Sequence, residues 1–372
     1  MPSLIPLGPK WSHLSPAKFI VSASDTRFDR QIRFAAMGEQ GQARLQSARV
    51  LLVGTGALGG VLAQNLVRAG VGELILCDRD IVELSNLPRQ VLFEDRHAAA
   101  KTPKATAALE TLARIGGPTK LRAEACHVDA ENLPELADGV QLVLDGTDNL
   151  ATRYLINDWC VAEDTPWVYG GVVGSGGLVL PILPGQSACL RCIFPDPPPA
   201  GSLPTCDSAG VIAPAVGTIA SMQAGAALRI LSSARGKGTA ESPTHAPGMT
   251  PKLLQIDVWT GSLLTVDATR RPGCPTCDEG NFEFLHAAAT RDPVVLCGRN
   301  TVQISGGPTK PDLGAIAQRS AAFADDVQNL GVLLRITDSG IVLTLFPDGR
   351  ALVEGTDEVD RARALYDRYL GA

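Results

Sequence analysis

The chain has 372 residues, of which 45% are hydrophobic and 19% are charged, and its formal net charge is −6. This length allows one large domain and a small one, and the composition excludes a chain that is disordered throughout. The acidic balance argues against a nucleic-acid-binding protein, and no apolar run approaches the length of a membrane span. The first residues lack the pattern of a secretory signal, so we expect a cytoplasmic protein.

The first half of the chain alternates between strand and helix patterns. Residues 1–24 are rich in Pro and Ser without a sustained period, and we expect an extended arm there. The pattern then predicts a buried strand at 48–53, a helix at 57–70 and a strand at 72–78. Further strands are expected at 120–128, 141–149 and within 167–183, and helices at 104–116 and 152–164. This alternation predicts an α/β fold, doubly wound around a mostly parallel sheet.

The second half predicts the end of this large domain and then a separate small one. A loop rich in Pro, Cys and Gly is expected at 184–210, followed by a helix at about 211–233 and strands at 252–259 and 261–268. Beyond residue 280 we expect a small α+β domain, 281–372. Its expected strands lie near 293–297, 301–304, 331–336, 340–346 and 350–354, and its expected helices near 312–329 and 357–370.

The sequence VGTGALGG at 53–60 lies between a predicted strand and a predicted helix. The glycines Gly54, Gly56 and Gly59 would let the backbone approach a phosphate, and the helix N-terminus would add partial positive charge. Asp78 ends the next strand, where a carboxylate can accept hydrogen bonds from ribose hydroxyls. This arrangement suits a dinucleotide and ATP equally, and a tight packing turn without a ligand is a third interpretation.

Polar side chains further along the chain favour ATP. Asn86, Arg89 and Lys104 fall in loops or at helix starts near the predicted strand ends, and Asp148 follows a strand where it could hold Mg²⁺. When a carboxylate attacks the α-phosphate of ATP, negative charge builds on the phosphoryl oxygens and on the departing pyrophosphate. Each residue alone would be an ordinary solvated side chain, but together they match the cations and the Mg²⁺ that this reaction needs.

Longer segments strengthen this interpretation. They include RFDRQIRFAAMGEQGQARLQSARVLLVGTGALGG, LILCDRDIVELSNLPRQ, DGTDNLATRYLINDWC, GQSACLRCIFPDPPP and RPGCPTC. From about residue 25 to residue 277 the chain resembles the ThiF/MoeB family of sulfur-carrier adenylyltransferases, relatives of the ubiquitin-activating enzymes. The resemblance implies a Rossmann-like adenylation domain with a zinc knuckle at 25–280. It also implies ATP-dependent adenylation of the C-terminal glycine of a ubiquitin-like sulfur carrier with a Gly-Gly tail, before thiocarboxylate formation.

The resemblance also assigns roles to single residues. Asp148 matches the family's magnesium-associated aspartate, and Arg30 matches an arginine that the family inserts into the neighbouring subunit's site, which implies a homodimer. Two features depart from the family: GTDN replaces the usual CTDN, and HAAAKTPK leaves Lys101 as an alternative to the preferred Lys104. The implied nucleotide contacts are Gly54, Gly56, Gly59, Asp78, Asn86, Arg89 and Lys104.

Four of the nine cysteines form two pairs, Cys189-x-x-Cys192 and Cys274-x-x-Cys277. Four thiolates suit structural Zn²⁺, because a closed tetrahedral site leaves no open position for catalysis. The alternative is one redox pair and one incidental pair. The family has the same two knuckles, which favours zinc.

The remaining cysteines divide into one candidate and several packing residues. Cys206 lies in GSLPTCDSAG before a helix, and the resemblance implies a covalent intermediate there with the carrier or with a sulfurtransferase or cysteine desulfurase. The alternative is an exposed thiol without a role. Cys297 lacks the surroundings of a rhodanese cysteine, and we expect Cys77, Cys126 and Cys160 to pack in the core.

Two other functions also fit parts of the sequence. The glycine turn alone also fits an NAD-dependent oxidoreductase, and a non-catalytic carrier-binding scaffold is the second alternative. The five histidines form no cluster, and we expect them to be ordinary surface or loop residues.

The glycine run near 168–180 is expected to let the carrier tail lie close to the backbone, with Gly174 as the test position. The sequence does not choose between thiamin, molybdopterin and tRNA thiolation, nor does it give 281–372 a role.

Overall fold

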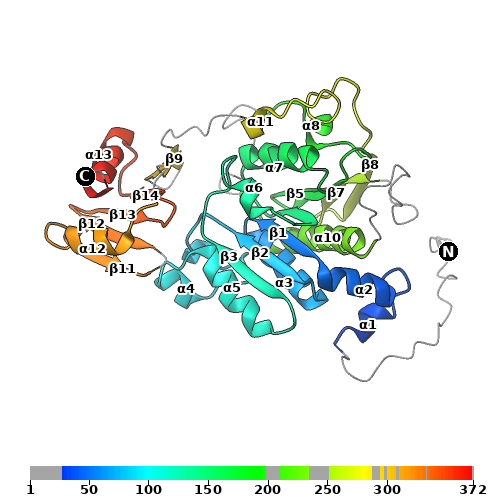
Figure 1. Ribbon diagram of the computed structural model, residues 1–372, viewed down its shortest axis with the longest axis horizontal. Coiled ribbons are helices and arrows are strands. Elements are labelled where there is room, and N and C mark those ends of the chain that lie inside the picture. Colours follow the sequence, from blue (N-terminus) through cyan, green and yellow to red (C-terminus); the bar gives the residue numbers. More distant parts are fainter. Residues whose placement is uncertain are drawn as a thin grey trace.

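The computed structural model describes residues 27–197, 209–233, 251–286, 294–296, 300–306, 310–331 and 333–370. They form an eight-stranded sheet and a six-stranded sheet. The six-stranded sheet and its helices make up a smaller body, which we call the C-terminal unit (residues 294–370) and which lies at one end of the molecule (Figure 1). The expected arm at 1–24, Cys206 and Cys297 lie outside the described residues.

The large sheet has the order β3-β2-β1-β4-β5-β6-β7-β8. The strands from β3 to β5 are parallel, and β6, β7 and β8 add an antiparallel extension. The strands are β1 Arg49–Val53, β2 Glu73–Cys77, β3 Lys120–Glu124, β4 Leu142–Asp145, β5 Trp167–Val173, β6 Gly176–Ile182, β7 Lys252–Asp257 and β8 Ser262–Asp267. The chain runs from β1 outward to β2 and β3, then crosses back to β4 on the other side, so the strand order reverses between β1 and β4.

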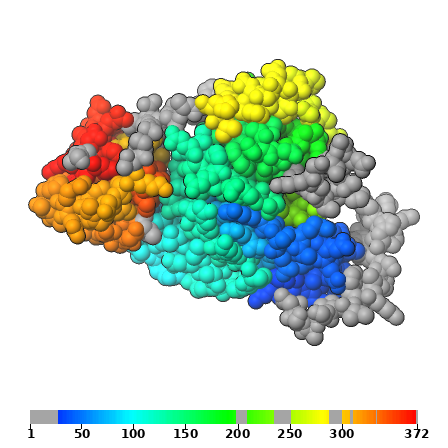
Figure 2. Space-filling view, in the orientation of Figure 1, coloured from blue at the N-terminus to red at the C-terminus, as the bar shows by residue number. Residues whose placement is uncertain are grey.

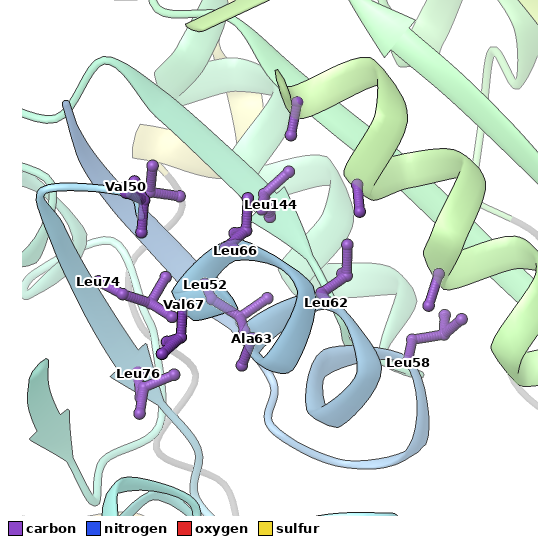
Figure 3. Packing of buried hydrophobic residues seen from close by; sticks show 14 of the residues in the cluster. Val50, Leu52, Leu58, Leu62, Ala63, Leu66, Val67, Leu74, Leu76 and Leu144 are labelled. Carbon is purple, nitrogen blue, oxygen red and sulfur yellow. The ribbon is translucent and has the colours of Figure 1, made fainter. Parts of the chain in front are cut away.

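Helices cover both faces of this sheet, and successive residues of one strand serve opposite faces. In β1, Val50 and Leu52 join the core under α3 and α10, whereas Leu51 and Val53 join the core under α6 and α7. Figure 3 shows the α3 side of this core against β1, β2 and β4. The helices are α1 Asp29–Ile32, α2 Gly38–Ser47, α3 Ala57–Ala69, α4 Asp95–Ala99, α5 Lys104–Ile115, α6 Leu133–Leu136, α7 Leu150–Ala162, α8 Leu190–Ile193, α10 Ala213–Ser232 and α11 Glu283–His286, with a 3₁₀ turn η2 at Leu84–Asn86.

The C-terminal unit is an antiparallel sheet with the order β11-β12-β13-β14-β10-β9. The expected helix at 312–329 is wrong in its second half: α12 ends at Ser320, and 326–329 form a strand. The Asp325 N–H donates to the Thr337 carbonyl at 2.9 Å, so pairing with β12 overrides the local helical pattern. The elements are β9 Val294–Leu296, β10 Thr301–Ile304, α12 Leu313–Ser320, β11 Asp326–Asn329, β12 Leu334–Asp338, β13 Ile341–Leu345, β14 Ala351–Glu354 and α13 Val359–Leu370.

Within the described part of the chain, no helix combines the length and the apolar character needed to cross a membrane. In Figure 2 the C-terminal unit, in orange and red, packs against the large α/β body rather than standing apart from it. The contact passes through Ile81, which follows β2.

Candidate active site

A cavity of about 440 Å³ opens at the carboxyl ends of the parallel strands. Its walls include Val53 at the end of β1 and residues 146–150 after β4, so it lies where the strand order reverses. Ligands of open α/β sheets bind at this position because the loops there diverge and leave a crevice. The volume is in the usual range for small-molecule sites.

The glycine turn forms the floor of the cavity. Gly54 has a φ of +89°, which strongly favours glycine, and Gly54 and Gly56 both line the cavity. Gly59 is not among the lining residues. A Cβ on Gly59 would lie 1.9 Å from the Gly54 carbonyl oxygen, and one on Gly146 would lie 2.3 Å from the same atom. Gly59 therefore lets α3 approach the turn closely instead of facing a ligand.

Asp78 stands one residue beyond β2 and lines the cavity. Its carboxylate accepts hydrogen bonds from the Thr55 N–H at 2.7 Å, the Thr55 hydroxyl at 3.0 Å and the Asp80 N–H at 2.9 Å. Burial raises the pKa of Asp78, while Lys104 opposes this effect. The side chain is thus fixed beside the glycine turn, in the place where a ribose ligand is expected.

Lys104 begins α5, and its side chain is only 8% exposed. Its Nζ lies 3.0 Å from Asp80 Oδ2. Burial disfavours the ammonium, but the carboxylates of Asp80 and Asp78 outweigh burial and raise the pKa of Lys104, so it stays charged. Lys101 is not among the residues that line this cavity.

The other expected polar residues divide into two groups. Arg89 and Asp148 line the cavity, and the Arg89 Nη1 donates to the Ser85 carbonyl at 2.8 Å. Asn86 is buried and does not line it. The Asn86 side-chain oxygen accepts the Glu83 N–H at 3.0 Å, so this residue shapes the loop that carries Arg89.

The cavity also contains one member of a buried ion pair, Arg153–Asp145, which the sequence did not reveal. Arg153 lines the cavity from α7, and its Nε lies 2.9 Å from Asp145 Oδ2. The Nη2 of Arg153 donates to the carbonyls of Thr147 at 2.5 Å and Gly170 at 2.9 Å. These bonds fix the turn after β4, which carries Asp148, against β5. The only signal in the sequence was an arginine one helical turn into the helix after GTDN.

The histidines include two exceptions to the expectation of ordinary surface residues. His97 is buried in α4, where its Nδ1 accepts the Glu94 N–H at 3.1 Å. His127 lines the cavity. Burial and the nearby guanidinium groups of Arg79 and Arg350 lower the pKa of His127 to about 4, so it is neutral near pH 7. Cys126 also lines the cavity, because β3 ends at Glu124 rather than at residue 128.

Arg30 lies in α1 and is exposed. It is not among the lining residues of this chain's cavity, and α1 lies at the end of the molecule opposite the C-terminal unit (Figure 1). A role for Arg30 in catalysis would therefore require a second copy of the chain.

The two CxxC pairs converge although 85 residues separate them. Sγ–Sγ distances are 3.9 Å for Cys189–Cys192, 3.6 Å for Cys189–Cys274 and 3.4 Å for Cys192–Cys277. The four sulfur atoms all lie within 4.8 Å of one another. Four sulfur ligands ~2.3 Å from a tetrahedral zinc ion would stand roughly 3.8 Å apart. The cluster therefore fits a four-thiolate metal site.

Two polar residues of α7 hold both halves of this cluster. The Asn157 side-chain oxygen accepts the Leu190 N–H at 2.8 Å, beside the first knuckle. The Asp158 carboxylate accepts the Thr276 hydroxyl at 3.0 Å, within the second. Both residues are fully buried. Hydrogen bonds to α7 therefore attach both CxxC segments to the large domain.

The model of the ThiF family matches residues 28–276. The chain is 37% identical, over 93% of its length and 99% of the relative's, to the sulfur carrier protein ThiS adenylyltransferase of Bacillus subtilis (strain 168). It is 36% identical to the sulfur carrier protein adenylyltransferase of Thermus thermophilus, covering 68% of this chain and 90% of that protein.

A solved structure of E. coli MccB with ATP superposes with a TM-score of 0.55 at 20% identity, covering 68% of this chain and 74% of that one, which shows a shared fold. These matches confirm the expected fold class and the expected class of enzyme, an adenylyltransferase. The chain belongs to the ThiF family.

Proposed function

We propose that this protein uses ATP to adenylate the C-terminal glycine of a ubiquitin-like sulfur carrier that ends in Gly-Gly. One observation carries the proposal. A single cavity at the reversal of strand order collects the glycine turn, Asp78 and the cationic side chains of Arg89, Lys104 and Arg153. An NAD-dependent oxidoreductase is not favoured, because the chain belongs to the ThiF family and its relatives are named adenylyltransferases.

The proposed reaction forms one bond and breaks one. An oxygen of the carrier's terminal carboxylate bonds to the α-phosphorus of ATP, and the bond from that phosphorus to the pyrophosphate oxygen breaks. Asp78 would accept hydrogen bonds from the ribose, while Lys104 and Arg89 would offset the charge on the phosphates. The low exposure of Lys104 matters because a preorganised charge acts more strongly where water is excluded.

Asp148 is the proposed ligand of Mg²⁺, because its exposed carboxylate stands at the cavity edge on the turn after β4. A bound magnesium ion would neutralise phosphate charge. The rigid Asp145–Arg153 pair would hold Asp148 in place for this role.

We propose a homodimer in which Arg30 reaches the neighbouring subunit's cavity. Arg30→Ala and Asp148→Asn chains should each be inactive. Mixing them should then restore roughly a quarter of the activity, because about half of the random dimers contain one intact site out of two. If the mixture stays inactive while the subunits exchange, Arg30 acts elsewhere.

The cysteine cluster is proposed to bind structural Zn²⁺ and to tie 189–192 to the end of the adenylation domain, which we place at 25–280. Cys206 remains the proposed covalent site for the carrier or for a sulfurtransferase or cysteine desulfurase. A cytoplasmic location is proposed, because cysteines gathered into a candidate metal cluster are typical of proteins in reducing compartments.

The carrier tail is proposed to enter along the β5–β6 hairpin, whose Val173 and Gly176 line the cavity. Gly174 is a poor test position, because its N–H and carbonyl already bond to Gly210 and Ile212 and its φ is +63°. Val173→Arg should weaken use of the carrier and spare ATP binding, and equal loss of both would contradict this path.

The deciding experiment is ATP–pyrophosphate exchange with purified protein, candidate carriers and Mg²⁺. Exchange that needs both a carrier and Mg²⁺ would support the proposal, and the active carrier would indicate the pathway. Asp148→Asn should abolish exchange, whereas the control Asp138→Asn, at an exposed aspartate outside the cavity, should not. ATP binding without exchange for any carrier would favour a carrier-binding scaffold.

A further inference from the structure

The C-terminal unit touches the candidate active site through the turn between β13 and β14. Arg350 ends this turn, and its Nη2 donates a hydrogen bond to the carbonyl oxygen of Arg79, 271 residues earlier in the chain. Arg79 directly follows Asp78, and both line the cavity. The turn therefore grips the backbone of the loop that carries the proposed ribose ligand.

An apolar contact accompanies this hydrogen bond. Ile81, from the same loop after β2, packs with Leu333, Phe346 and Leu352 of the C-terminal unit. All four side chains are buried, and Ile81 is 5% exposed. The loop is thus held to the C-terminal unit at two points, by a polar contact at residue 79 and by an apolar one at residue 81.

Several contacts within the C-terminal unit hold the turn that presents Arg350. The Phe346 N–H donates to the Arg350 carbonyl at 2.9 Å, and the Tyr366 hydroxyl of α13 donates to the Gly349 carbonyl at 2.8 Å. The Arg350 guanidinium lies over the Phe346 ring at 3.8 Å from its centroid. Asp348 faces the Arg350 Nε at 3.8 Å. The guanidinium is therefore preorganised before it meets the loop.

Arg350 is an expensive residue to bury. It is only 2% exposed, and its Nε and Nη1 have no hydrogen-bond partner among the described residues. Burial lowers the pKa of Arg350, while the carboxylates of Asp348 and Asp80 oppose this effect. A buried, incompletely paired cation is a poor choice for stability alone. The hydrogen bond from Arg350 to the Arg79 carbonyl indicates instead that Arg350 positions the loop after β2.

The loop also sets the geometry of Lys104. The Lys104 N–H donates to the Asp80 carbonyl at 2.8 Å, and its Nζ lies 3.0 Å from the Asp80 carboxylate. Any shift of residues 78–80 would move Asp78 and the Asp80–Lys104 pair together. These residues are the proposed contacts to the ribose and the phosphates, so the backbone conformation of this loop affects both sets of contacts.

We propose that Arg350 is a positioning residue for the nucleotide: by holding the Arg79 carbonyl, the C-terminal unit keeps residues 78–80 in the conformation that binds ATP. This inference rests on the proposed function of the cavity. The C-terminal unit would then take part in ATP binding and not in the proposed path of the carrier tail along β5 and β6.

The test uses the full chain and compares Arg350→Met, Arg350→Lys and a control, Arg368→Met. Methionine keeps much of the length but removes every donor, and lysine restores one donor and the charge. Arg368 lies in the same unit, pairs with Asp338 at 2.6 Å and stands over the rings of Phe323 and Tyr369, which also belong to this unit. Binding of ATP would be measured by calorimetry without a carrier, and KM values and kcat in the exchange assay.

Arg350→Met should raise the Kd and KM for ATP about 10-fold, the effect of one lost hydrogen bond from a charged donor. The KM for the carrier and kcat should stay within twofold. Arg350→Lys should recover part of the loss, and the control should match the wild type. A merely structural role would weaken ATP binding, raise the KM for the carrier and lower kcat together, and this result would overturn the inference.

Ile81→Ala weakens the same attachment from the loop side and keeps the idea testable if Arg350→Met fails to fold. It should raise the Kd for ATP in the same selective way. If both variants bind ATP as tightly as the wild type, the inference is wrong and the proposed function stands. If the wild type itself binds no ATP, the proposed function fails first.

Discussion

Replacement of Arg153 by methionine would leave the Asp145 carboxylate buried without its partner. The side chains of this pair are 10% and 0% exposed, and Arg153 also donates to the carbonyls of Thr147 and Gly170. Breaking a buried pair by removing one member typically costs about 3–5 kcal/mol, out of a total free energy of unfolding of about 5–15 kcal/mol. We therefore expect Arg153→Met to lose about 3 kcal/mol or more in urea unfolding followed by tryptophan fluorescence.

Two comparisons separate this cause from general damage. The double variant Asp145→Asn/Arg153→Met should be more stable than Arg153→Met alone by about 2 kcal/mol, because the unpaired charge is gone. The control Arg122→Met removes a half-exposed pair with Glu124 and should cost less than about 1 kcal/mol. A loss below 1 kcal/mol for Arg153→Met, or a double variant less stable than the single one, would refute the reasoning.

The pH dependence has a definite sign. Burial already raises the pKa of Asp145 in the folded protein, and Arg153 opposes this effect. Without Arg153 the folded-state pKa should rise further above the unfolded value, so the folded state binds more protons than the unfolded state in that window. The loss of stability in Arg153→Met should therefore shrink as the pH falls from 7 toward 4.

Three further predictions concern other parts of the molecule. Gly59→Ala should lower the free energy of unfolding by about 3 kcal/mol or more, because its Cβ would lie 1.9 Å from the Gly54 carbonyl oxygen. The control Gly225→Ala lies in open space on α10 and should raise the free energy of unfolding by about 0.5–1 kcal/mol. Urea unfolding measures both. Cys192→Ser should lower bound zinc, measured by mass spectrometry of the metal, together with the melting temperature; unchanged zinc would exclude the cluster as the site. His127→Asn should make stability less sensitive to acid. The pKa of His127 is about 4 in the folded protein and about 6.5 in the unfolded chain, so this one group contributes roughly 3 kcal/mol of stability that is lost as the pH falls between these values. A variant whose stability falls as much as that of the wild type over this range would contradict this assignment.

Local patterns were sufficient for much of the large domain. The strands at β1, β2 and β4 are short apolar runs buried on both faces, and such runs are recognisable without tertiary information. The glycine turn has its own signature, since a strand, closely spaced glycines and a helix follow one another. The two CxxC pairs likewise predicted one metal site, because four thiolates suit a closed tetrahedral zinc site.

The interior of the site could not be predicted in this way. Asn86 and Gly59 match the nucleotide motif in sequence, yet neither lines the cavity. Asn86 shapes a loop, and Gly59 lets α3 pack closely against the Gly54 carbonyl. In the sequence Arg153 is one polar residue of a predicted helix. Its role depends on the Gly170 carbonyl of β5, to which it donates a hydrogen bond only in the folded protein. The sequence of β11 predicted a helix, but antiparallel pairing with β12 makes it a strand.

The same distinction applies to the C-terminal unit. Its strands near β12, β13 and β14 are predictable from local alternation, but no local pattern relates Arg350 to Arg79. That contact exists because folding brings together segments 271 residues apart and removes water from between them. For β1, β2, β12, β13 and β14 the type of element followed from the local sequence, but β11 required its pairing partner β12. The burial, charge state and partners of a side chain always depend on what packs against it from elsewhere in the chain.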